Sequence, residues 1–143
     1  DNSGVQYDQL KYPEGSSSVI LASGIEARLI EAEAALSRGD VATWLEKHSE
    51  LRGLVGLDPL QDPGSEDARV DLHFSERARW LYAEGHRLAD LRRLVRQYGR
   101  TADSVFPSGK YRKGGSYGTD VNWIVPQEEE NNPLFTGCLD RGA

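Results

Sequence analysis

The dipeptide Gly39-Asp40 separates two apolar stripes at helical spacing, and this junction constrains the fold more than any other feature of the chain. Glycine favours the left-handed conformation that ends a helix, and aspartate is a preferred N-cap of the next one. The first stripe consists of Ile25, Leu29, Ala32 and Leu36, and the second of Val41, Trp44, Leu45, His48, Leu51 and Val55. The pattern predicts two amphipathic helices in an antiparallel, tetratricopeptide-like hairpin.

Further capping and breaking signals predict where these helices begin and where two more follow. Ser23 and Glu26 have the spacing of a capping box, so the first helix is expected to start at Ser23. Residues 56–67 are rich in proline and glycine and predict a loop. Gly85 is expected to break a third helix from a fourth, which ends at Gly99. The apolar face of the third helix is Phe74, Ala78, Leu81 and Tyr82, and that of the fourth is Leu88, Leu91, Val95 and Tyr98.

The two ends of the chain lack such periodicity. Residues 1–18 are polar and turn-rich and predict an N-terminal arm, which leaves residues 19–143 as a single domain. From Phe106 onward, glycines alternate with aromatic residues, which is typical of an irregular hairpin or a long ordered loop. Residues 121–125 are a candidate short strand, and residues 127–143 a tail wrapped on the helices. The predicted fold class is therefore mainly α, with two tetratricopeptide-like hairpins, an irregular C-terminal loop and a tail.

The charge of the chain is unevenly distributed. The formal net charge is −6, yet residues 77–113 hold ten Lys/Arg against three Asp/Glu, so they carry +7 and the remainder −13. This asymmetry favours contact between the basic segment and acidic parts of the same chain or of a partner. Nucleic acid is not expected as a partner, because the acidic flanks would repel phosphate. No apolar run approaches the roughly 20 residues of a membrane-spanning helix, so no transmembrane segment is expected.

Several motifs occur in an order that resembles the C-terminal part of the SusD/RagB-like family. Residues 76–93 are similar to a family helix with a Glu-Arg pair that runs into an aromatic-Glu-Gly-His-Arg turn and then Asp-Leu-Arg-Arg. Residues 124–127 and 131–133 resemble the family's Pro-Ile-Pro-Gln…Asn-Pro ending. Residues 31–34 and 52–57 resemble its Ala-Glu-Ala helix and its Arg-Ala-Gly-Leu helix end.

This resemblance implies a helical fold with tetratricopeptide-like hairpins in an extracytoplasmic setting. Family members bind glycans or other nutrients, partner a TonB-dependent outer-membrane transporter and are not enzymes. They are also much longer, and the resemblance covers only about residues 23–133, so the chain is expected to be a shortened member. The family's lipidated N-terminal cysteine has no counterpart here, and no ligand-binding residue is carried over.

The densest cluster of ionisable residues has both a catalytic and a structural interpretation. An acid/base pair beside an arginine would suit proton transfer, whereas an ion-pair network would fix a helix junction. The spacing favours the network, since Asp90 follows Arg87 by three residues and His86 by four, on one helical face. An enzyme is therefore not expected. The predicted network consists of Glu76, Arg77, Glu84, His86, Arg87, Asp90, Arg92 and Arg93.

No cofactor or metal is expected from the remaining motifs. The three histidines, at positions 48, 73 and 86, lack His-x3-His spacing, and no Cys-x2-Cys motif accompanies them. His48 lies on the apolar stripe of the second helix and is interpreted as a satisfied, partly buried side chain. The glycines near Lys110 lack the spacing of a phosphate-binding loop.

The aromatic residues of the glycine-rich segment 106–126 are the candidate contact residues, namely Tyr111, Tyr117 and Trp123. Flat aromatic faces serve for anchoring in a protein partner or for stacking on sugars. A surface hairpin with one ring in the core explains the pattern equally well. The leading hypothesis is a periplasmic or cell-surface accessory subunit, peripheral to a membrane, that docks on a larger membrane-associated protein complex. The alternative is a glycan- or nutrient-binding protein that partners a TonB-dependent transporter.

Overall fold

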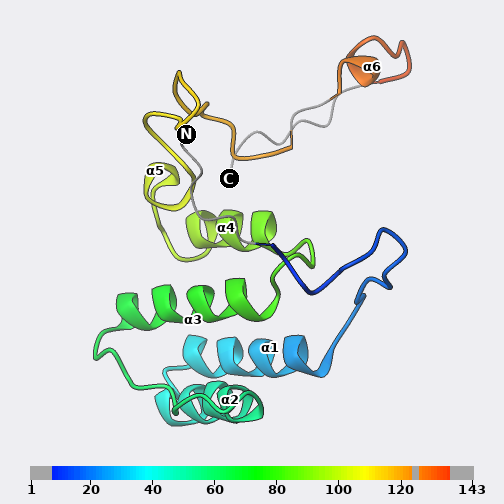
Figure 1. The fold of residues 1–143 in the computed structure, drawn as a ribbon. Helices are drawn as coiled ribbons and strands as arrows, with labels where there is room; N and C mark the ends of the chain where they lie inside the picture. Colours follow the sequence, from blue (N-terminus) through cyan, green and yellow to red (C-terminus); the bar gives the residue numbers. More distant parts are fainter. Residues whose placement is uncertain (1–7, 124–125, 136–143) are drawn as a thin grey trace, which may run out of the picture. The chain divides into compact units, whose positions relative to one another are not determined.

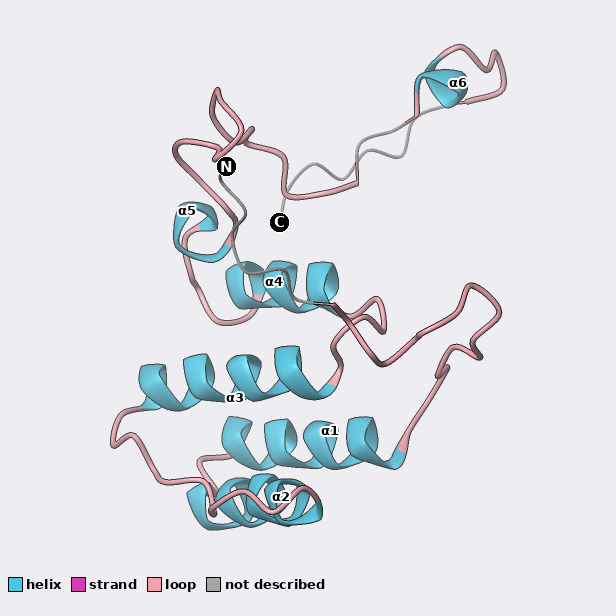
Figure 2. Ribbon diagram, in the orientation of Figure 1, coloured by secondary structure: helices cyan, strands magenta, loops and turns pink. Residues whose placement is uncertain are grey.

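The computed structural model describes residues 8–123 and 126–135, and within them the chain is mainly helical, as predicted (Figures 1 and 2). It divides into two compact units, residues 1–86 and 87–143. Unit 1 holds the helices α1 (Gly24–Ser37), α2 (Val41–Leu54) and α3 (Glu66–Trp80). Unit 2 holds α4 (Arg87–Arg96), α5 (Ala102–Val105) and α6 (Gln127–Glu130). The prediction of one domain over residues 19–143 stays a prediction.

In unit 1, α1 begins and ends where the capping residues predict. The Ser23 hydroxyl accepts a hydrogen bond from the Glu26 amide at 3.1 Å, which satisfies one of the unpaired amides of the first turn. The Glu26 carboxylate lies 3.6 Å from His86 instead of completing the capping box. Gly39 adopts φ +73, and the Asp40 carboxylate then accepts from the Thr43 amide to cap α2.

The core of unit 1 forms where α1 packs against both α2 and α3 (Figure 1). Leu29, Leu51 and Leu81 make a buried cluster on which Ile25 and Trp80 pack. Ile25 and Leu29 lie four residues apart on α1, so this helix turns one face to the cluster, and burial of apolar side chains drives the packing. The tetratricopeptide-like arrangement of the helices stays a prediction.

Two residues predicted on apolar faces are exposed, and both predictions were wrong for the same reason. Val55 is 59% exposed because α2 ends at Leu54, and Tyr82 is 57% exposed because α3 ends at Trp80. Helical spacing no longer governs side-chain direction beyond the last helical residue. Leu81, by contrast, is buried as predicted.

The turn between α3 and α4 confirms the predicted break at Gly85, which has φ +82. Ala83 in the same turn also adopts a left-handed conformation, with φ 60. The arm docks here, because the Lys11 ammonium donates to the Tyr82 carbonyl at 3.0 Å and forms an ion pair with Glu84. The predicted arm is thus part of unit 1 over its described residues.

In unit 2, the glycine-rich segment forms an irregular hairpin. An isolated antiparallel bridge joins Lys110 to Ser116, and no strand occurs among the described residues. Residues 121–123 of the predicted strand are not extended into a sheet, and residues 124 and 125 lie outside the described residues. The predicted wrapped tail is not found over residues 131–135, which are exposed, and residues 136–143 lie outside the described part.

Candidate functional site: a pocket in unit 1

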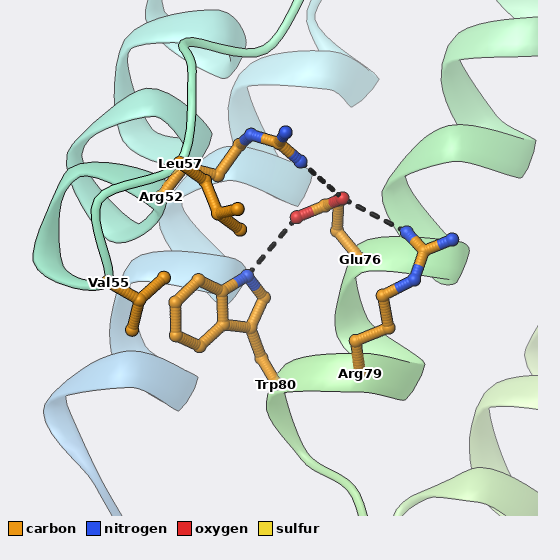
Figure 3. A pocket seen from close by; sticks show the side chains of 6 residues that line it. All are labelled: Arg52, Val55, Leu57, Glu76, Arg79 and Trp80. Atoms are coloured by element: carbon orange, nitrogen blue, oxygen red, sulfur yellow. Dashed lines mark hydrogen bonds and ion pairs between the residues drawn. The ribbon is translucent and has the colours of Figure 1, made fainter.

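A pocket of about 500 Å³ opens between the C-terminal end of α2 and the last turns of α3 (Figure 3). Its volume falls in the range of small-ligand and side-chain pockets. Six side chains from three places in unit 1 line it: Arg52 on α2, Val55 and Leu57 just after α2, and Glu76, Arg79 and Trp80 on α3. The pocket therefore combines two cations, one anion and three apolar groups.

Glu76 accepts three hydrogen bonds that fix the polar wall of the pocket (Figure 3). Its Oε1 accepts from Arg52 at 3.0 Å and from Arg79 at 3.1 Å, and its Oε2 accepts from the Trp80 indole at 3.2 Å. Because the Glu76 side chain is only 4% exposed, these donors compensate for its loss of water. Charge-assisted bonds of this kind hold both guanidinium groups beside one oxygen.

The pocket remains positively charged after this pairing, because two arginines face one carboxylate. Arg52 also donates from Nε to the Asp58 carbonyl at 2.6 Å, which orients its guanidinium group. Arg79 is the more accessible of the two, with a side chain that is 67% exposed. The site can therefore accept a carboxylate attached to an apolar group.

The apolar side of the pocket continues onto the surface. Leu54 is the last residue of α2, Val55 and Leu57 follow within three positions, and all three are more than half exposed. Contiguous exposed apolar side chains beside a pocket are typical of interaction sites, whereas scattered ones are not. We call these three residues the apolar rim. The sequence does not predict this pocket, although residues 52–57 lie in a segment that resembles a family motif.

Several members of the predicted ion-pair network form ion pairs among the described residues. Asp90 and Arg93 form an ion pair at 3.3 Å, as expected for neighbours on one helix. Three other members contact residues outside the predicted set. Glu76 pairs with Arg52 and Arg79, Glu84 pairs with Lys11, and His86 lies beside Glu26. Arg77 is buried, Arg87 is exposed and Arg92 is half-buried.

The predicted aromatic contact residues all lie at the surface of unit 2. Tyr111 and Tyr117 lie edge to face, with ring centroids 5.2 Å apart. They face each other because the Lys110–Ser116 bridge aligns the two arms of the hairpin. Trp123 is 83% exposed. None of these three rings is in the core of its unit.

A buried histidine pair between α2 and α3 is the second feature that the sequence did not predict. His48 Nε2 lies 2.9 Å from His73 Nδ1, and His73 Nε2 lies 3.5 Å from the Glu33 carboxylate on α1. Both imidazoles are fully buried, so His48 is more buried than predicted, and its Nδ1 has no hydrogen-bond partner among the described residues. His73 precedes Phe74 on the same apolar face of α3, which is the signal that would have identified it.

The pKa of His48 is lowered to about 3, because burial penalises the charged ring and because the electrostatic effects of His73 and Arg52 also disfavour it. The ring is therefore neutral at pH 7. Trp44 and His73 cover it edge to face. With no exposed atom, the pair has no access to a substrate at the surface, and its role is structural.

No group of three or more His, Cys, Asp or Glu residues that could hold a metal ion occurs in the described part of the chain. In residues 8–123 and 126–135, no helix has the length and apolar character to cross a membrane. Comparisons of the chain with protein families, with curated proteins and with solved structures found no match.

Proposed function

We propose that the chain is a non-enzymatic interaction subunit that docks, outside the cytoplasm, on a larger membrane-associated protein complex. The observation that carries this proposal is the pocket of unit 1 with its exposed apolar rim. A partner segment with an apolar side chain and a carboxylate matches both parts of the site. The extracytoplasmic location and the shortened SusD/RagB-like architecture rest on the resemblance of residues 76–93 to that family.

The chemistry of the pocket supports binding more than catalysis. Glu76 is fully engaged by Arg52, Arg79 and Trp80, so its carboxylate is not poised to take a proton from a substrate. Apolar anchors in a pocket, surrounded by polar contacts, are the usual source of affinity between proteins. The guanidinium groups then select a partner of opposite charge.

We expect Leu57→Asp to remove the chain from its native complex. Leu57 is 52% exposed, so the substitution leaves the core intact but places a charge in the apolar part of the pocket. The loss of complex should exceed tenfold. The measurement is separation of gently solubilised source membranes by size, with detection of the chain by mass spectrometry. Leu21→Asp is the matched control, because Leu21 is 95% exposed and lies away from the pocket lining.

Three outcomes of this experiment are informative. Co-migration of the wild-type chain with one large complex at fixed stoichiometry, kept by Leu21→Asp and lost by Leu57→Asp, would support the proposal. Migration of the wild-type chain by itself would refute it. Equal retention of both variants would also count against the pocket, because the charge should not be tolerated at a docked apolar site.

Glycan binding is the second candidate, and the exposed Trp123 favours it. An indole face open to water suits stacking on a sugar ring. We expect Trp123→Ala to weaken binding of a soluble oligosaccharide about tenfold. The measurement is a screen of the labelled full chain against a broad oligosaccharide panel. Absence of binding by the wild-type chain across the whole panel would eliminate this candidate.

A further inference from the structure

The hairpin of unit 2 combines exposed aromatic and basic side chains on a small, self-supporting turn. We call residues 109–117 the basic hairpin. Its backbone is closed by hydrogen bonds from the Tyr111 amide to the Gly115 carbonyl at 3.0 Å and from the Tyr117 amide to the Gly109 carbonyl at 2.9 Å. Gly109, Gly114 and Gly115 adopt positive φ, which other residues rarely do. The shape is therefore built locally, without a core of its own.

The basic hairpin carries concentrated positive charge that the described residues do not neutralise. Lys110, Arg112 and Lys113 are exposed, and none of them forms an ion pair within residues 8–123 and 126–135. The nearest acidic residues in the sequence are Asp103 and Asp120. Unit 2 as a whole has nine Lys/Arg and seven Asp/Glu, so its net charge is +2, against −8 for unit 1.

Two amphipathic rings accompany these cations. Tyr111 and Tyr117 pack on each other and remain 38% and 42% exposed. Tyrosine is enriched at the level of lipid headgroups, where its ring meets the apolar layer and its hydroxyl meets water. Lysine and arginine next to such rings attract anionic lipids, each by about 1 kcal/mol.

We propose that the basic hairpin binds the anionic surface of a lipid membrane. Nine residues are too few to bury the roughly 800 Å² per partner of a standard protein interface. Lysine is also depleted in the cores of protein interfaces, whereas it is common in segments that lie on anionic membranes. Such binding would hold the protein at the membrane surface, and the proposal rests on the membrane-associated location in the proposed function. It uses unit 2 and does not involve the pocket.

The test is co-sedimentation of the full chain with vesicles. Vesicles of phosphatidylcholine with phosphatidylglycerol are compared with phosphatidylcholine alone, at low and at high salt. We expect binding to the anionic vesicles that falls as salt screens the charges. The triple variant Lys110→Gln/Arg112→Gln/Lys113→Gln should bind about 100-fold more weakly, from three contributions of about 1 kcal/mol. In the otherwise wild-type chain, Tyr111→Ala/Tyr117→Ala should also weaken binding to anionic vesicles, although it leaves the charge unchanged.

A matched control separates the hairpin from the overall charge. The triple variant Arg28→Gln/Arg38→Gln/Arg87→Gln removes an equal number of positive charges from exposed positions outside the basic hairpin. It should bind anionic vesicles within about threefold of wild type. Equal weakening by both triple variants would overturn the proposal, because no local site would then exist. Failure of the wild-type chain to bind anionic vesicles at low salt would also overturn it. Either result leaves complex formation through Leu57 to be judged by its own experiment.

Discussion

Lowering the pH from 7 to 4.5 is expected to reduce the free energy of unfolding by about 2 to 3 kcal/mol through His48 alone. The pKa of His48 is about 3 in the folded chain and about 6.5 when it is exposed. Because the folded pKa is the lower one, the unfolded state binds the proton more readily. The contribution of His48 is complete above pH 6.5 and is lost progressively as the pH falls towards 3.

The packing around His48 explains why protonation is so unfavourable. The ring has no exposed atom, and the electrostatic effects of His73 and Arg52 both oppose an imidazolium at His48. The Glu33 carboxylate contacts His73 rather than His48, so it does not compensate for a charge on His48. A proton is therefore taken up mainly by opening the contact between α2 and α3.

Urea unfolding followed as a function of pH measures this contribution. His48→Gln keeps a polar group near His73 but does not titrate, so its stability should fall less between pH 6.5 and 4 than that of the wild type. His86→Gln is the control, because the His86 side chain remains 29% open to water. If the difference between wild type and His48→Gln did not vary with pH, the proposed origin of the acid sensitivity would be wrong.

Trp44→Ala is expected to destabilise unit 1 by about 3 to 5 kcal/mol. Trp44 is fully buried in α2 and packs edge to face on His48, with ring centroids 5.4 Å apart. Removing it leaves a cavity and also uncovers the histidine pair. Since small domains are stable by only about 5 to 15 kcal/mol, this single change should approach the limit of folding at 37 °C.

Two further substitutions make this prediction specific. The Trp44 indole N–H has no hydrogen-bond partner among the described residues, so Trp44→Phe removes an unpaired buried donor and should lose much less stability. Trp123→Ala should stay within about 0.5 kcal/mol of wild type, because Trp123 is exposed. Chemical denaturation of the three variants measures the series. Equal losses for the two tryptophan-to-alanine variants would contradict the core assignment of Trp44.

The predictable parts of the fold are those set by neighbouring residues. Ser23 and Asp40 specify helix starts because their side chains accept hydrogen bonds from amides three residues away, and Gly39 marks the end of α1 by its left-handed backbone, so the sequence predicted α1 and α2 closely. Gly85 and Gly99 likewise mark breaks, through backbone conformations that only glycine adopts easily. The single-turn helices α5 and α6 were missed, because four residues are too few to display a period.

The candidate site was not predictable, because it depends on contacts between distant residues. Arg52 and Glu76 are 24 positions apart, and the chain offers many other oppositely charged pairs. The sequence placed Glu76 and Glu84 in one network, but folding gives them different partners, Arg52 and Lys11. Tyr111, Tyr117 and Trp123 are exposed, which the local glycine-rich hairpin and loop explain, and their role as contact residues stays a prediction.

The contact of Lys11 with the turn after α3 has a consequence for the order of events during synthesis. Its partners Tyr82 and Glu84 follow it by 71 and 73 residues, whereas α1 meets α2 across a connection of three residues. Contacts that close short loops form fastest, so the α1–α2 pair should assemble while the later helices are still being made. The arm can attach only after residue 84 has left the ribosome, which makes it a late-closing segment of unit 1 and the last to be protected from proteases.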